Sequence, residues 1–176
     1  MTDIASAFID QSRKLLIDSY LPRIEGAVAG LSTENIWWRA NEQSNSIGKL
    51  ILHLDGNLRQ WIVSGLGREP DLRNRSEEFK QRAGWTGPEL LQRLRGTVEE
   101  VDAVLAKVEP ASLLAPKRIQ GYDVTVMRAI YTAVEHFSMH TGQIILLAKT
   151  WKGDLGFYDL SQGSPRPTWP GGTAGH

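Results

Sequence analysis

The sequence predicts an all-α fold, most simply a four-helix bundle with long crossover connections. Apolar residues recur every three or four positions in four long segments, and no segment alternates for long enough to suggest a sheet. The chain has 176 residues, of which 41% are hydrophobic, and this suits one globular domain with a sizeable core. We expect the bundle to occupy residues 1–152 and an irregular tail to occupy residues 153–176.

The first predicted helix runs from about Asp3 to Val28. Pro22 should kink it, because a proline inside a helix removes a backbone hydrogen bond. The candidate core residues of this helix are Ile4, Phe8, Leu15, Leu16 and Ile24.

The second predicted helix begins near Ser46, a residue type that caps helix N-termini well. Glycines and Pro70 in "SGLGREPD" end it. The charged connection over residues 66–85 is longer than a tight helical hairpin needs, so it predicts a crossover and roughly parallel second and third helices. The apolar positions of the second helix are Ile47, Leu50, Ile51, Leu54, Leu58, Trp61 and Ile62.

The third predicted helix has the best-marked start in the chain. Thr86 and Glu89 form a capping-box pattern, and Pro88 stands in the first turn. Prolines and glycine then predict a second irregular connection, and a fourth helix should run from Asp123 or Thr125 to about Thr150. The seam of the third helix is Leu90, Leu91, Leu94, Val98, Val101, Leu105 and Val108.

Charge and cysteine content narrow the function classes. Lys+Arg and Asp+Glu number 20 each and no basic run occurs, so neither nucleic acid nor an anionic membrane is a favoured partner. The absence of cysteine removes disulfides, thiolate nucleophiles and cysteine-based metal sites. No segment approaches about 18 consecutive apolar residues, and we expect a cytoplasmic protein with a small-molecule or protein partner.

Two histidines, His136 and His140, lie four positions apart in the apolar segment "AVEHFSMHTGQII". Residues four apart share one helix face at roughly 6 Å, so both rings could reach one ion. Both point toward the bundle interior, as does His53, which flanks the seam of the second helix. Three neutral imidazoles fit a catalytic-type site for Zn²⁺, Ni²⁺ or a similar divalent ion, whereas the alternative is three separate core histidines bonded to backbone or side-chain acceptors.

Two known kinds of metal site do not fit. A zinc protease of the His-Glu-x-x-His type needs a glutamate directly after its first histidine, and Phe137 stands there. A di-iron carboxylate bundle needs a glutamate three residues before its histidines, and none of these histidines has one. The sequence therefore disfavours both peptidase and dinuclear oxygenase chemistry.

The segments "NSIGKLILHLDGNLRQWI" (45–62) and "HFSMHTGQI" (136–144), in this order, resemble the two signature segments of the DinB/YfiT-like superfamily. The resemblance covers roughly residues 3–150. It implies a four-helix bundle with an unusual crossover, commonly dimeric, that binds one divalent metal ion through His53, His136 and His140. Characterised relatives include thiol transferases and isomerases that use low-molecular-weight thiols, while many members have no assigned reaction.

Two amides lie one helical turn from these histidines, Asn57 after His53 and Gln143 after His140. Each is a candidate to hydrogen-bond a metal ligand or a substrate, and the alternative for each is a structural packing role. The leading hypothesis is a homodimeric metal-dependent enzyme, a thiol S-transferase or a hydrolase acting on a small electrophile. The alternative is a catalytically silent bundle that is stabilised by metal or binds a ligand.

Overall fold

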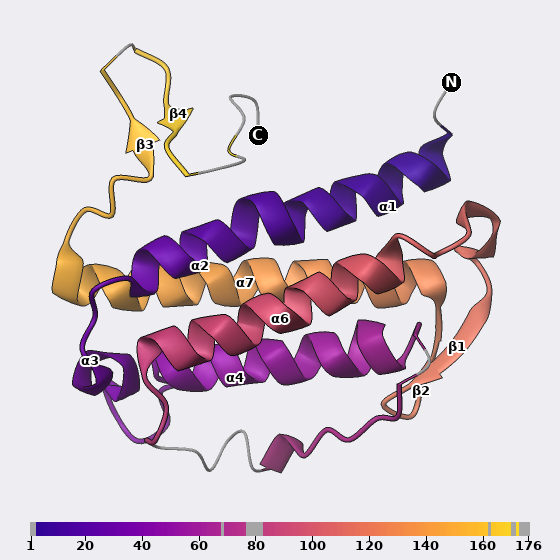
Figure 1. Ribbon diagram of the computed structural model, residues 1–176, viewed down its shortest axis with the longest axis horizontal. Helices are drawn as coiled ribbons and strands as arrows, with labels where there is room; N and C mark the ends of the chain where they lie inside the picture. Colours follow the sequence, from indigo (N-terminus) through magenta and orange to yellow (C-terminus); the bar gives the residue numbers. More distant parts are fainter. Residues whose placement is uncertain (1–2, 68, 77–82, 162, 170–171, 173–176) are drawn as a thin grey trace.

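Helices make up most of the chain, as the sequence predicted, in the computed structural model (Figure 1). The structure describes residues 3–67, 69–76, 83–161, 163–169 and 172. None of the helices in these ranges is both long enough and apolar enough to cross a bilayer. The helices are α1 (Ile4–Lys14), α2 (Leu21–Val28), α3 (Thr33–Trp37), α4 (Ile47–Leu58), α6 (Gly87–Leu105) and α7 (Val126–Lys152), with π-helical segments at Leu15–Tyr20 and Arg59–Ser64 and a 3₁₀ turn at Pro110–Ser112.

The irregularity predicted at Pro22 lies in the turns that precede it. Pro22 stands in the first turn of α2, and the π-helical segment Leu15–Tyr20 joins α1 to α2 without a break. Because proline has no N–H for the carbonyl four residues earlier, the regular hydrogen-bond pattern cannot run through this point. One core assignment is wrong: Ile4 is 90% exposed, since the buried stripe of Ile9, Ser12 and Leu16 lies about 100° away around the helix.

Helices α4 and α6 run in the same direction, as the sequence predicted for its second and third helices (Figure 1). The Trp37 ring of α3 lies over Gly48 in the first turn of α4, and its Nε1–H donates to the carbonyl of Trp85, just before α6. At the opposite ends, Gly67 lies against Val104. Of the connection between the two helices, residues 68 and 77–82 lie outside the described ranges.

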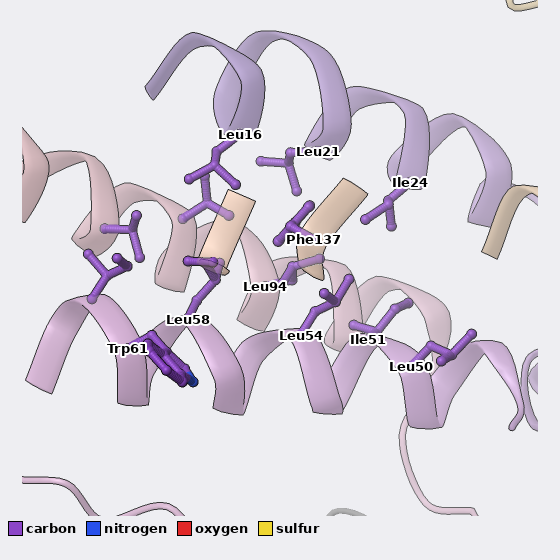
Figure 2. Packing of buried hydrophobic residues seen from close by; sticks show 14 of the residues in the cluster. Leu16, Leu21, Ile24, Leu50, Ile51, Leu54, Leu58, Trp61, Leu94 and Phe137 are labelled. Carbon is purple, nitrogen blue, oxygen red and sulfur yellow. The ribbon is translucent and has the colours of Figure 1, made fainter. Parts of the chain in front are cut away.

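The core lies between α1–α2, α4, α6 and α7, and side chains from all of these helices meet there (Figure 2). Phe137 of α7 is fully buried and stacks on Tyr20 at a centroid distance of 6.1 Å. Helix α4 is the most completely buried of the described helices, since each residue from Leu50 to Leu58 is buried. This helix is therefore enclosed by its neighbours, and any polar side chain on it needs a partner inside the protein.

A β-hairpin occupies part of the second connection, which the sequence had predicted to be irregular. Strands β1 (Pro116–Ile119) and β2 (Tyr122–Thr125) pair antiparallel around a two-residue turn. Both turn residues have positive φ, 55° at Gln120 and 82° at Gly121, as a tight hairpin turn requires. Thr125 then caps α7 by accepting a hydrogen bond from the Arg128 N–H, so the predicted start of the fourth helix is correct.

The tail after α7 is more ordered than predicted. It contains two short paired strands, β3 (Tyr158–Asp159) and β4 (Arg166–Pro167). Leu155 and Phe157 pack against the core, and the Phe157 ring lies over Gly26 of α2. The sequence did not predict these strands and contacts, in which two apolar side chains bring this part of the chain back onto the helices.

Candidate metal centre

The three histidines come from two helices that pack side by side, His53 from α4 and the other two from α7. The Ser46 hydroxyl caps α4 by accepting from the Lys49 N–H, and Thr125 caps α7 in the same way. His53 and His140 are 7% and 8% exposed, and His136 is half-buried. Rigid, well-capped helices therefore hold all three imidazoles at the edge of the core.

The three Nε2 atoms converge. His136 Nε2 lies 3.1 Å from His53 Nε2 and 3.2 Å from His140 Nε2, and the candidate ligand atoms all lie within 4.8 Å of one another. Two nitrogens bound at about 2.1 Å to one ion are roughly 3.0 to 3.4 Å apart when they subtend a right or tetrahedral angle. The predicted convergence is confirmed, and the two distances to His136 Nε2 fit ligands that share one divalent ion.

Gln143 orients the imidazole of His140. Its Oε1 lies 2.7 Å from His140 Nδ1, and because an amide oxygen only accepts, Nδ1 carries the proton. The Nε2 lone pair of His140 therefore faces the other two rings, which is the arrangement that metal-binding histidines usually show. Asn57 is 6% exposed and lies one turn from His53 on α4, and its contact with the cluster stays a prediction.

Burial keeps the imidazoles of His136 and His140 neutral. Desolvation, followed by the charges of His140, His53, Arg73 and Arg75, lowers the pKa of His136 to about 3. Desolvation also lowers the pKa of His140, and the hydrogen bond to Gln143 opposes this effect in part. At neutral pH both rings therefore present lone pairs, the form in which imidazole binds metal.

The second nitrogen of His136 is unsatisfied. His136 Nδ1 is buried and has no hydrogen-bond partner within the described ranges. A structural histidine and a metal ligand would both normally satisfy this atom with a backbone or side-chain partner, so it does not distinguish between the two roles. Within the same ranges, the contacts that hold the His136 ring are those between its Nε2 and the other two histidines.

Arg73 contacts the cluster, and no pattern in the sequence predicted this contact. Its Nη2 lies 3.2 Å from His53 Nδ1, and its Nη1 donates to Gln60 Oε1 at 2.9 Å. Gln60 also donates to Asp71 Oδ2 at 2.7 Å, and the Ser64 hydroxyl donates to the Pro70 carbonyl at 3.1 Å. These bonds hold residues 69–76 against the π-helical end of the second helix, so a residue from the charged connection reaches a histidine.

Comparison with known proteins identifies a family over most of the chain. Residues 3–161 match the family described as "Protein of unknown function (DUF1572)". The chain belongs to the DUF1572 family. No curated protein and no solved structure matches it. The family description assigns no reaction, so the chemistry of this DUF1572 chain has to be argued from its own residues.

A cavity of about 530 Å³ in this DUF1572 protein is linked to the histidine cluster through Arg73, while none of the three histidines is among its described lining residues. It lies between α4, α6 and residues 69–76, and its size suits a small molecule. Arg73 lines the cavity and also contacts His53, so its guanidinium lies between the two. Other lining residues include Leu52, Gly56, Arg59, Val63, Trp85 and Arg93.

Asp55 forms a buried polar link between α4 and α6 on the wall of this cavity. It is 1% exposed, and its two oxygens accept hydrogen bonds from Thr97 Oγ1 at 2.5 Å and Arg93 Nε at 2.7 Å. Asp55 therefore bonds to α6, whereas the His53 ring faces α7. Its role in this arrangement is to join two helices.

Proposed function

We propose that the protein is a divalent-metal-dependent enzyme in which His53, His136 and His140 hold one ion, Zn²⁺, Ni²⁺ or similar. The observation that carries the proposal is the approach of their Nε2 atoms to 3.1 and 3.2 Å. Within the described ranges, the cluster contains neither a carboxylate nor a fourth histidine. Three protein ligands with a remaining position for water or substrate are typical of catalytic sites, and a closed set of four is typical of structural ones.

The proposed reaction is thiol S-transfer or hydrolysis at a small electrophile. A bound ion would supply Lewis-acid chemistry, lowering the pKa of a thiol or a water molecule. Gln143 would fix the orientation of His140, and burial would keep the rings of His136 and His140 neutral. The cavity lined by Arg73 would bind and orient the small molecule, and orientation of this kind accounts for a large part of many catalytic effects.

The resemblance to the DinB/YfiT-like superfamily supports the same proposal and extends it. The parallel course of α4 and α6 is consistent with a four-helix bundle with crossover connections. We infer a low-molecular-weight thiol as one substrate, a cytoplasmic location and a homodimer. The exposed side chains Tyr131, Met139 and Leu146 share one face of α7 that a second copy could cover, and sedimentation equilibrium tests this.

The second candidate function is a catalytically silent bundle that an ion stabilises. The burial of His53 and His140 favours it, because an ion between α4 and α7 would add folding free energy even without access for a substrate. The two candidates differ in turnover and share the metal site.

The test begins with elemental analysis of the purified protein, followed by a thiol-transfer and hydrolysis screen on chelator-treated protein with and without added Zn²⁺ or Ni²⁺. We expect about one ion per chain and metal-dependent turnover that His53→Ala abolishes. Ser138→Ala, an exposed position on α7 between the two histidines, is the matched control and should behave as wild type. Metal binding without turnover would favour the silent bundle, and a wild-type protein that binds no ion would refute both candidates.

A further inference from the structure

The hydrogen bond between Arg73 and His53 fixes where His53 carries its proton. A guanidinium only donates, so the contact of 3.2 Å requires a lone pair on His53 Nδ1. A neutral imidazole with an unprotonated Nδ1 carries its proton on Nε2. Nε2 is the atom of His53 that faces His136 at 3.1 Å.

This proton position conflicts with metal binding. Ligation through Nε2 needs the lone pair of that nitrogen, and the ring proton must then move to Nδ1, where it would meet an N–H of Arg73. His140 has no such conflict, because Gln143 offers an acceptor to its Nδ1. The contact of Gln143 with His140 therefore favours a tautomer that can bind an ion through Nε2. The contact of Arg73 with His53 favours the tautomer that cannot.

We propose that Arg73 is a positioning residue that opposes ion binding, holding His53 in its non-ligating tautomer until the guanidinium leaves Nδ1. The proposal rests on the proposed metal site and adds a residue that sets its affinity. A second effect acts in the same direction, since the positive charge of Arg73 reaches the cluster and disfavours a further cation there.

The cavity beside Arg73 provides a volume into which its guanidinium could move. Arg73 lines the cavity of about 530 Å³, so its guanidinium can rotate away from His53 toward this cavity. The segment that carries it stays attached, because the Gln60–Asp71 and Ser64–Pro70 hydrogen bonds do not involve the guanidinium. Ion binding and the shape of the cavity wall are thus coupled through one side chain.

The first test is a Zn²⁺ competition titration against a chelating dye, with wild type, Arg73→Ala and Arg75→Ala. Removing a charge-assisted hydrogen bond that competes with ligation should tighten Zn²⁺ binding by about tenfold or more in Arg73→Ala. Arg75→Ala is the matched control for charge, because the charge of Arg75 also lowers the pKa of His136. Equal affinities in the two variants, or binding in Arg73→Ala no tighter than in wild type, would overturn the proposal while leaving the metal site in place.

The second test needs no ion. Long-range ¹H–¹⁵N correlation spectra of chelator-treated wild type should show His53 protonated at Nε2 and His140 protonated at Nδ1, and Arg73→Ala should shift His53 toward the Nδ1 form. A His53 already protonated at Nδ1 in wild type would overturn the role of Arg73, whatever Zn²⁺ does. Absence of Zn²⁺ binding in both wild type and Arg73→Ala would instead reject the proposed function, and the role of Arg73 with it.

Discussion

The pKa of His136 is lowered in the folded protein, and this shift should make the stability of the chelator-treated protein depend on pH. Its pKa is about 3 in the folded protein, and an unfolded chain has the ordinary value of about 6.5. Between these values the unfolded state binds the proton and the folded state does not, so stability falls as pH decreases through this window. Above pH 6.5 the ring is neutral in both states and contributes no slope.

The measurement is urea unfolding at pH 7, 5.5 and 4.5 for wild type and His136→Gln. Other titrating groups are common to both proteins, so the difference between the two isolates His136. We expect the loss of stability between pH 7 and 4.5 to be smaller in His136→Gln. An equal or larger loss in the variant would show that His136 is protonated in the folded protein over this range.

At the scale of residues, the sequence predicted that the three histidines cluster, and it did not predict that Arg73 contacts them. Helical spacing alone places His136 and His140 on one face, and the same periodicity turns His53 inward. Gln143 could be proposed for the same reason, and it does bond to His140. Arg73 could not, because it lies in a connection whose course depends on bonds such as Gln60–Asp71, which no local pattern encodes.

At the scale of elements, the buried Asp55 link between α4 and α6 should contribute more than the half-exposed ion pair between α1 and α6. Asp55→Ala would leave the fully buried Thr97 hydroxyl without its acceptor, and we expect a loss of about 1 to 3 kcal/mol in the free energy of unfolding. Asp102→Ala, which removes the Arg13–Asp102 pair, is the matched control and should cost less than about 1 kcal/mol.

Chemical denaturation measures both losses, and a Zn²⁺ titration of each variant gives a second readout. Zn²⁺ affinity should stay at the wild-type value in both variants, because Asp55 bonds to α6 and does not contact the histidines. Similar losses of stability in the two variants would contradict the assignment of Asp55 as the stronger link.

The starts of the long helices were predictable because capping is local. Each of these helices begins at a residue whose side chain accepts a hydrogen bond from the backbone N–H three residues on. The sequence shows these capping residues at Ser46, at Thr86 with Glu89, and at Thr125. The β1–β2 hairpin was not predictable by the same means. Its strands have four residues each and its turn is Gln120–Gly121 in place of the Asn-Gly that marks such turns most clearly.

At the scale of the whole molecule, the length of one connection was enough to predict the course of the helices. A span of some twenty residues can return along a bundle about 30 Å long, and α4 and α6 do begin at the same end. The contacts of Leu155 and Phe157 with the core were not predicted, because the glycines and prolines of this segment leave no periodic pattern that would indicate them. The length of a connection can be read directly from the sequence, whereas the tertiary packing of a short segment cannot.

The whole-molecule prediction concerns the link that one ion would make between α4 and α7. His53 and His136 are 83 residues apart in the chain, so an ion that both bind is held by the folded state and not by the unfolded one. At a free Zn²⁺ concentration about 100 times the dissociation constant, this adds about 2.7 kcal/mol, or roughly 5 to 10 °C in Tm for a chain of this size. His53→Ala, His136→Ala and His140→Ala should each lose most of the shift, and the triple variant should lose little more, because all three act through one binding event. Thermal unfolding with and without Zn²⁺ measures this, with Ser138→Ala as the control that keeps the full shift. Three separate core histidines would give a different pattern, in which the losses of stability add up across the variants and are the same in the presence and absence of Zn²⁺.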